Sequence, residues 1–319
     1  MGTELDRASF CGGSDIAAIL GLSPWKTAVQ LWDEKRNPRP DSDSPAKARG
    51  RRWEAVVGEM LRESLVEEGF SLAILDVNKR YMDGDNPWMR AEVDMVGILT
   101  ARDGPALSME VNVELKTVHP FKAREWGESA SDELPTHYTA QAMWGLGVTG
   151  RQRCIVAALF GADELRTYTV ERDEDTIQWM RAEAVKFWDL VQTGVPPQPV
   201  ALVDLDVLHP REGTAPALFA DAELTRQLMR MRALDREIKA REAEWDVLEF
   251  EIKRAMGDCE TLVIGSEGKP AAVWKSRAHT HLDQQRLKAE HPALHKALTV
   301  KSESRVFTLK PFSIEGVMP

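Results

Sequence analysis

The sequence predicts a mixed α/β chain whose strands alternate with amphipathic helices. Strand-like runs lie at 89–99, 107–118, 154–160 and 164–171. Apolar residues recur at helical spacing in 48–68, 135–147 and 173–192. Strands enclosed by helices are typical of an α/β or α+β core.

Local signals place the turns and one helix start. Asp103-Gly104 separates the first two strand-like runs, and 161–163 separates the second two, so we expect two hairpins. Ser14 precedes the apolar residues Ile16 and Ile19, and it is expected to be the N-cap of a short helix.

Composition excludes several classes of protein. The 319 residues are 43% hydrophobic and 29% charged, which excludes global disorder and a collagen-like chain. The three cysteines lie far apart without a CxxC pair, so a zinc ribbon or iron–sulfur cluster is not expected. No signal peptide is recognisable, and the longest clean apolar run, 154–160, is too short to span a membrane. We therefore expect a soluble, cytoplasmic protein without a membrane partner.

Charge is unevenly distributed along the chain. The net charge of −10 argues against a simple basic nucleic-acid coat protein. Residues 1–217 contain 24 Lys and Arg against 35 Asp and Glu, whereas residues 269–310 contain nine basic and three acidic residues. The basic stretch is expected to contact DNA or an acidic partner, or to be an ordinary solvated surface.

Three regions follow from these patterns: a domain over 1–192, a proline-rich linker over 193–217 and a smaller C-terminal α+β module over 218–319. In the module we expect a long helix over 220–256, strands at 261–265, 271–276 and 304–309, and a helix at 283–297. Apolar residues recur every seven positions in the long helix (Leu224, Met231, Ile238, Trp245, Ile252). A stripe packed on its own domain is preferred to an intermolecular coiled coil.

A cluster of charged residues on two neighbouring strands points to chemistry. Strand residues alternate faces, so Glu114 and Lys116 face away from Val113 and Leu115. In a hairpin of natural register, Asp94 meets Glu114 beside Lys116. Two close carboxylates repel unless a cation lies between them, and Mg²⁺ suits such a site, with Mn²⁺ able to substitute. The Leu115 carbonyl is a natural further ligand. The alternative is a charged strand face exposed to solvent.

Six ordered motifs over about residues 5–192 resemble a known family. They are Arg7 followed by Gly12-Gly13-Ser14-Asp15; Gly21-Leu22-Ser23-Pro24-Trp25; Arg49-Gly50-x-x-x-Glu54; Trp88-Met89-Arg90-Ala91-x-x-Asp94; Glu114-Leu115-Lys116; and Pro135-x-x-Tyr138-x-x-Gln141. This set is similar to the phage-lambda-type alkaline exonucleases and YqaJ-like viral recombinases, within the PD-(D/E)xK nuclease superfamily. The resemblance implies a central mixed sheet flanked by helices.

The resemblance also implies roles for individual residues. Asp94, Glu114 and, from the other side, Glu54 would bind metal, and Lys116 would serve the attacking water. Gln141 and Tyr138 would orient the site, although Tyr138 is equally interpretable as a core residue. Arg7 and Ser14 would bind a DNA 5′-phosphate, which suits a guanidinium and a hydroxyl at a helix start; Arg7 is equally interpretable as a surface arginine.

The implied activity is a Mg²⁺-dependent 5′-to-3′ exonuclease on double-stranded DNA ends. It would produce 3′ single strands for an annealing partner in phage or prophage recombination inside a bacterial host. The resemblance favours a homo-oligomer, a trimeric ring, whose basic wall would include Arg49, Arg51, Arg52, Lys122 and Arg124. The alternatives are an endonuclease of the same superfamily, in restriction or repair, and a non-catalytic DNA-binding protein that retains the fold.

Overall fold

The computed structural model describes residues 7–39, 44–102, 108–265, 268–310 and 312. The chain divides into two compact units, Met1–Pro210 and Arg211–Pro319.

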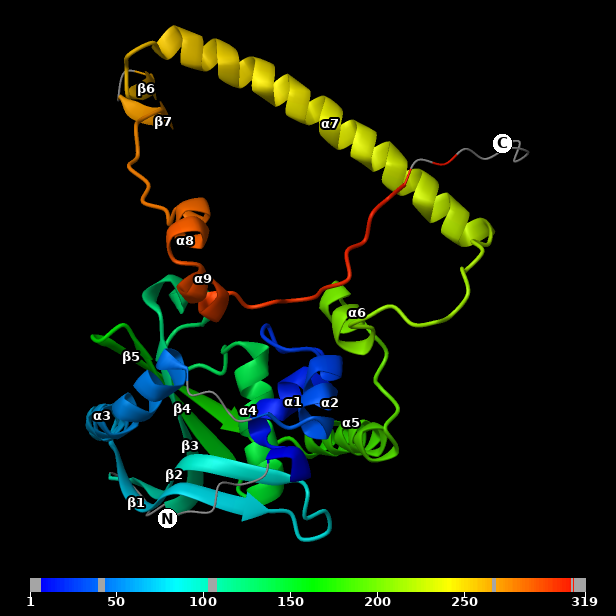
Figure 1. Ribbon diagram of the computed structural model, residues 1–319. Coiled ribbons are helices and arrows are strands. Elements are labelled where there is room, and N and C mark those ends of the chain that lie inside the picture. The colour runs from blue at the N-terminus through cyan, green and yellow to red at the C-terminus, as the bar shows by residue number, and fades with distance from the viewer. Residues whose placement is uncertain (1–6, 40–43, 103–107, 266–267, 311, 313–319) are drawn as a thin grey trace. The chain divides into compact units, whose positions relative to one another are not determined.

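A five-stranded mixed sheet forms the centre of the first unit (Figure 1). Its strands are β1 (Phe70–Met82), β2 (Arg90–Ala101), β3 (Ser108–Val118), β4 (Arg153–Phe160) and β5 (Glu164–Glu171), and they lie side by side in chain order. Neighbouring strands are antiparallel except β3 and β4, which are parallel. A parallel pair needs a long connection, and α4 (Thr136–Thr149) lies within it.

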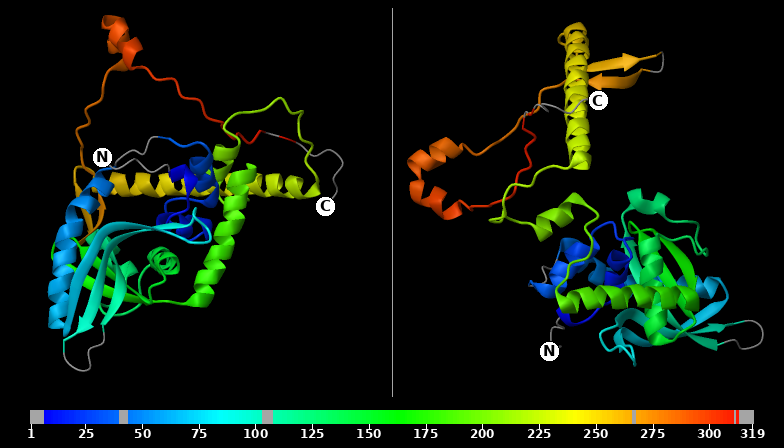
Figure 2. Two further views of the ribbon diagram at one scale, coloured as in Figure 1. Left: turned by 90° about the horizontal axis from the view of Figure 1, so that it is seen from below. Right: turned by 90° about the vertical axis from the view of Figure 1, so that its right-hand side faces the viewer.

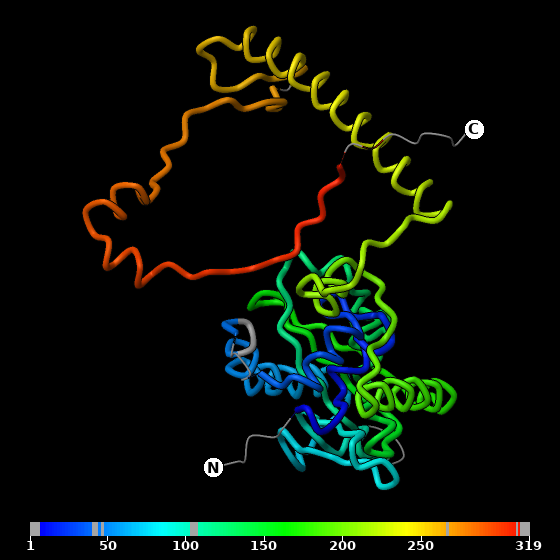
Figure 3. The backbone as a smooth tube through the Cα atoms, turned by 45° about the vertical axis from the view of Figure 1, so that its right-hand side comes forward, coloured from blue at the N-terminus to red at the C-terminus, as the bar shows by residue number. Residues whose placement is uncertain are grey.

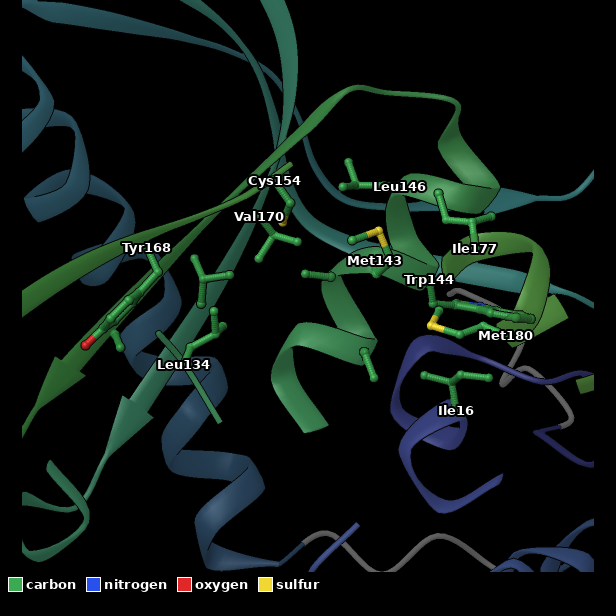
Figure 4. Close-up of a cluster of buried hydrophobic side chains, with 14 of the residues drawn as sticks. Ile16, Leu134, Met143, Trp144, Leu146, Cys154, Tyr168, Val170, Ile177 and Met180 are labelled. Atoms are coloured by element: carbon green, nitrogen blue, oxygen red, sulfur yellow. The ribbon is translucent and has the colours of Figure 1, made fainter. Parts of the chain in front are cut away.

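Helices cover both faces of this sheet (Figure 2). On one face, α3 (Pro45–Glu67) packs Val57 and Leu61 against Val111 and Val113 of β3. On the other face, α4, α1 (Gly13–Ile19) and α5 (Glu174–Thr193) enclose a second core, which includes Met143 and Trp144 of α4, Ile16 of α1 and Cys154 of β4 (Figure 4). The predicted central mixed sheet flanked by helices is therefore confirmed.

Most predicted elements of this unit are present, with bounds shifted by a few residues. Both predicted hairpin pairings form, although residues 103–107 of the first turn lie outside the described residues. Prediction missed β1, α2 (Ala28–Arg36) and the short helices η1 (Arg7–Ser9) and η2 (Pro120–Glu125). β1 lies at the edge of the sheet, and its exposed positions include the apolar Leu75 and Val77 as well as Lys79 and Arg80, so apolar and polar residues do not alternate clearly.

The segment after α5 belongs to the first unit as far as Pro210. Within the expected linker, residues Leu202–Leu208 form α6. Asp204 is fully buried and accepts hydrogen bonds from the Thr27 hydroxyl and from the main-chain N–H groups of Val200 (2.8 Å) and Ala201 (3.0 Å). The first part of the proline-rich segment is therefore fastened to α2.

The second unit is a smaller α+β module, as predicted. It contains α7 (Ala222–Met256), the hairpin β6 (Thr261–Ile264) and β7 (Lys269–Val273), and two short helices, α8 (Gln284–Glu290) and α9 (Pro292–Leu298). Figure 3 traces α7 as one continuous helix.

Three expectations for this unit were wrong. No strand forms at 304–309, where the chain has no regular structure. The helix expected over 283–297 is interrupted at His291, because Pro292 disfavours helical backbone in the preceding residue. The apolar stripe of α7 is exposed rather than packed within the described part of its own unit.

Candidate active site

Asp94 lies where β2 and β3 separate. Their antiparallel ladder runs from Thr100 opposite Ser108 to Met95 opposite Val113, one residue before Asp94 would face Glu114. Beyond it, the Leu115 N–H donates a hydrogen bond of 2.7 Å to Asp94 Oδ2 instead of to a main-chain carbonyl. The Asp94 carboxylate thus takes the place of a main-chain acceptor at the point where the β2–β3 ladder ends.

Glu114 occupies the predicted face of β3, but this face is covered. Its side chain is 5% exposed and contacts Gln141 of α4. Glu114 Oε2 accepts hydrogen bonds from Gln141 Nε2 and Lys116 Nζ, each 2.8 Å long. The predicted alternation of faces along β3 is confirmed. The alternative, a strand face exposed to solvent, is wrong for Glu114, because this side chain is buried and its two hydrogen-bond donors replace the water that would otherwise solvate its charge.

The electrostatics of this pair follow from burial. Burial and, secondarily, the nearby charge of Asp94 raise the pKa of Glu114 to about 7, against the opposing effect of Lys116. Burial alone would lower the pKa of Lys116, but Glu114 and Asp94 outweigh it and raise that pKa. The two carboxyl groups thus favour the charged form of Lys116, whose Nζ lies 2.8 Å from Glu114 Oε2.

Tyr138 forms an aromatic wall beside the ammonium group. Lys116 Nζ lies 5.6 Å from the centre of the Tyr138 ring, within the range of a cation–π interaction. The ring also packs against Trp126 and His137 at the edge of the core. The structure thus gives Tyr138 a core contact and a contact with a predicted catalytic residue.

Glu54 lies on α3, the helix that packs on the opposite face of the sheet from α4. A cleft of about 340 Å³ lies between α3 and strands β1 to β3, and Glu54, Asp94 and Leu115 all line it. Gly58 of this helix packs directly on Met95: a Cβ there would lie 2.2 Å from Met95 Cε, so the methionine side chain would have to move. Burial raises the pKa of Glu54, and the negative charge of Asp94 raises it further.

Asn78 is a site residue that prediction missed. Its side chain hydrogen-bonds to Glu54, and it lines the same cleft. Its φ of 51° lies in the left-handed region, which asparagine tolerates better than most residues. A lone asparagine in an unrecognised strand offered no signal in the sequence.

The donor set suits a hard divalent cation. Carboxylate oxygens of Asp94, Glu54 and Glu114 and a main-chain carbonyl are the ligands that Mg²⁺ prefers. The N–H and C=O groups of one strand residue point to the same edge, so the Leu115 carbonyl points toward the side on which Asp94 accepts its N–H. Across the described ranges, however, no three His, Cys, Asp or Glu side chains already stand together as a metal cluster. An ion would have to draw these carboxylates together.

Arg7 and Ser14 meet at the start of α1. Arg7 Nη2 donates a hydrogen bond of 3.1 Å to Ser14 Oγ, and both side chains are exposed. The predicted N-cap was wrong: Gly12 is the cap, its N–H donates to Asp15 Oδ2 at 3.0 Å, and Ser14 lies inside the first turn. This helix start lies beside the site, because a Cβ on Gly13 would be 3.3 Å from Gln141 Cγ.

A buried ion pair that prediction missed supports this segment. Lys35 Nζ donates hydrogen bonds to Asp15 Oδ2 (2.7 Å), the Arg7 carbonyl (2.7 Å) and the Phe10 carbonyl (2.6 Å). The Lys35 and Asp15 side chains are 3% and 6% exposed. The pair joins α2 to α1 across twenty residues, a separation at which sequence spacing predicts nothing. The basic residues expected in a DNA-facing wall are all exposed: Arg49, Arg51, Arg52, Lys122 and Arg124.

Comparison with known proteins agrees with the motifs. Residues 4–152 match the family model described as the YqaJ-like viral recombinase domain. This part of the chain is similar to the YqaJ-like viral recombinase domain. The predicted resemblance is thereby confirmed, and it supports a nuclease role for this part of the chain.

A relative and two solved structures show the extent of the similarity. YqaJ of Bacillus subtilis (strain 168), itself uncharacterised, is 25% identical over 316 residues, covering 97% of this chain and 93% of YqaJ. An alkaline exonuclease of Laribacter hongkongensis is 14% identical with a TM-score of 0.46, over 59% of this chain and 91% of that chain. A phage-related exonuclease of Haemophilus somnus 129PT is 13% identical with a TM-score of 0.37, over 58% and 96%.

Among the helices of the described residues, none is both long and apolar enough to cross a membrane.

Proposed function

We propose that the YqaJ-like domain is a Mg²⁺-dependent exonuclease that degrades double-stranded DNA from its 5′ ends. Mn²⁺ is expected to substitute for Mg²⁺. The observation that carries the proposal is the contact between Glu114 and Lys116, 2.8 Å apart. It lies beside the point where β2 and β3 separate and where Asp94 accepts the Leu115 N–H. Glu54 supplies a third carboxylate from across the cleft.

Each residue has a task that its contacts support. Asp94, Glu54, Glu114 and the Leu115 carbonyl would hold the metal, which when bound would act as a Lewis acid on the scissile phosphodiester. Lys116 carries a positive charge that can orient water and stabilise negative charge developing on phosphate oxygens. Gln141 fixes one oxygen of Glu114, so the other oxygen keeps a defined direction.

Recognition of the DNA end is assigned to the start of α1. The guanidinium of Arg7 and the hydroxyl of Ser14 form an exposed donor pair suited to a terminal 5′-phosphate. The contact of Gly13 with Gln141 would bring such a phosphate close to the proposed catalytic residues. A free end would therefore be the preferred substrate.

The biological setting is the remaining part of the proposal. The 3′ single strands would pass to a single-strand annealing protein in the cytoplasm of a bacterial host, with the gene carried by a phage or prophage. A homo-oligomer, preferably a trimer, would enclose the DNA, so exposed basic residues could act locally despite the overall negative charge.

The test compares linear 5′-phosphorylated duplex with closed circular plasmid of the same sequence. With Mg²⁺, the linear DNA is expected to disappear and the circle to persist, whereas with EDTA both substrates are expected to persist. Cutting of the circle would favour the endonuclease alternative. Absence of Mg²⁺- or Mn²⁺-dependent hydrolysis from both substrates would favour the non-catalytic binding protein.

A matched pair of variants assigns the activity to this site. Glu114→Gln preserves shape and is expected to lower the linear-DNA rate by at least about 100-fold, the order of loss for a main electrostatic group. Glu92→Gln changes an exposed neighbour on β2 that pairs with Arg80, and it should retain activity. Equal rates for Glu114→Gln and wild type would show that the assigned site is wrong.

A further inference from the structure

The long helix of the second unit carries a heptad seam. Leu224, Met231, Ile238, Trp245 and Ile252 occupy its first position, usually written a. Three residues after each of these, at position d, the chain has Gln227, Leu234, Arg241, Leu248 and Ala255. The second row is mixed: Leu234, Leu248 and Ala255 are apolar, whereas Gln227 and Arg241 are polar. The seam spans about 47 Å at 1.5 Å per residue.

This seam is exposed along its length. Ile238, Trp245 and Leu248 are 55%, 68% and 57% exposed. Other described parts of the unit contact α7 away from the seam: the Trp274 ring lies 5.5 Å from Lys253 Nζ, and the Phe312 ring lies 4.6 Å from the Arg232 guanidinium. Met256, the last residue of the helix, is the one buried α7 residue among those described.

Acidic residues flank the seam on both sides. The flanking heptad positions, e and g, contain acids at seven places: Glu223, Asp235, Glu237, Glu242, Glu244, Glu249 and Glu251. The flank has one basic residue, Arg230. Several of these acids pair with basic residues of the same helix, but the pairs are exposed and therefore weak. The seam therefore presents an apolar stripe between two negative edges.

Charge decides which partner fits. In a parallel pair of α7 helices, Glu237 would face Glu242 and Glu244 would face Glu249 of the second copy; in an antiparallel pair, e residues would face e residues, which are also acidic. The first unit has 23 basic and 34 acidic residues, so it is a poor match by charge. DNA is excluded as the ligand of this face by the same negative edges.

Length argues against the chain's own basic stretch. The helices in 269–310 are α8 and α9, seven residues each, which is about 10 Å apiece. Neither reaches along a seam of about 47 Å, and Pro292 prevents them from forming one helix.

We propose that the α7 seam docks an amphipathic helix of a different protein, with apolar a and d residues flanked by lysine or arginine. Trp245, next to Leu248, is the anchor, since a large exposed aromatic residue gains most from burial in such an interface. This inference is independent of the nuclease proposal, because no seam residue lies in the catalytic domain.

The experiment uses the full chain and two labelled synthetic helices of about 28 residues, which is four heptads. One peptide has Leu at a and d with Lys at e and g, and the other replaces every Lys with Glu. Fluorescence anisotropy is expected to show saturable binding of the Lys peptide and at least about tenfold weaker binding of the Glu peptide. Failure of the Lys peptide to bind, or equal binding of both peptides, would overturn the proposal.

Two variants with the same added charge locate the surface. Trp245→Lys/Leu248→Lys changes the seam, whereas Val247→Lys/Phe250→Lys changes residues of similar exposure, 62% and 61%, on the far face. The seam variant should lose at least about tenfold in affinity and the control no more than about twofold. Equal losses of affinity in the two variants would mean that the peptide does not bind at the seam.

A third variant keeps the test informative if the seam variant folds poorly. Reversing the edge with Glu237→Lys/Glu242→Lys/Glu244→Lys should transfer preference to the Glu peptide; unchanged preference would overturn the charge argument. Sedimentation of wild type and seam variant without peptide should give equal masses. A smaller mass for the seam variant would show that a second copy occupies the seam, contrary to the proposal.

Discussion

At the scale of single residues, the proposed chemistry depends on Lys116 remaining charged while partly buried. Its side chain is 16% exposed, and an isolated ammonium group would lose its proton more readily there. Glu114 and Asp94 reverse that effect. The carboxylates therefore serve two purposes: they would hold the metal, and they keep a cation beside it.

Lys116→Met tests this role. The variant retains the aliphatic stem but lacks the charge, so cleavage of linear duplex is expected to fall by about 10²- to 10⁴-fold. Single-turnover digestion with saturating Mg²⁺ measures the loss. Lys186→Met, in an exposed pair with Glu183 on α5, is the control and should cost less than about twofold. An unchanged rate in Lys116→Met would remove this residue from the mechanism.

At the scale of elements, buried polar contacts decide how the helices of the first unit are fastened. The Lys35–Asp15 pair ties α2 to α1, and Asp204 ties α6 to Thr27 at the start of α2. Neither contact is part of the apolar core. Both place α2 at the centre of a network that holds the Arg7–Ser14 segment.

Lys35→Met should be strongly destabilising. It leaves Asp15 buried without its cation, which costs about 3–5 kcal/mol in the free energy of unfolding. Urea unfolding followed by circular dichroism gives the value. Lys26→Met removes an exposed pair with Glu34 and should cost less than about 1 kcal/mol. Comparable losses in the two variants would contradict the importance assigned to burial.

Asp204 predicts a dependence of stability on pH. Burial would raise its pKa, but hydrogen bonds from Thr27 and from two main-chain N–H groups outweigh this effect and lower the pKa. The group is therefore more acidic in the folded chain, so its contribution is present above its ordinary pKa and lost as pH falls below about 4. Asp204→Asn should lower the urea midpoint at pH 7 and weaken its decline toward pH 3. Asp206→Asn, exposed on the same helix, should leave both unchanged.

At the scale of the whole molecule, the chain is two units with different surfaces. The first unit contains the sheet and the candidate site, and it extends to Pro210. The second unit contains α7, whose exposed seam is flanked by acids, and a basic stretch near the C-terminus. DNA hydrolysis and partner binding can thus be assigned to separate units and tested separately.

Truncation tests the boundary. A chain of residues 1–210 should fold cooperatively, whereas a chain of residues 1–192 should have a lower melting temperature, because it lacks α6 and the hydrogen bonds of Asp204. Loss of a helix-start contact of this kind typically costs about 1–2 kcal/mol. Differential scanning calorimetry of both chains decides the question. Equal melting temperatures would show that the first unit needs no residues beyond 192 for its stability.

Local patterns predicted much of this protein because they depend on neighbours in the chain. Alternation in 107–118 assigned Glu114 and Lys116 to one face, and the hairpin signals paired β2 with β3 and β4 with β5. The same reasoning failed where a local signal was weak, as in β1, or was misread, as at Ser14, where Gly12 is the cap.

The sequence by itself determined the α/β class, the family resemblance and the order of the motifs, since each depends on residue type and short-range spacing. Only the tertiary structure decided that α4 covers Glu114, that Glu54 and Asn78 share a cleft with Asp94, and that Lys35 reaches Asp15. It also left the α7 seam exposed. These outcomes depend on which surfaces, distant in the sequence, bury each other. Burial sets the pKa and the hydrogen bonding of the side chains involved, and short-range sequence patterns do not predict that burial.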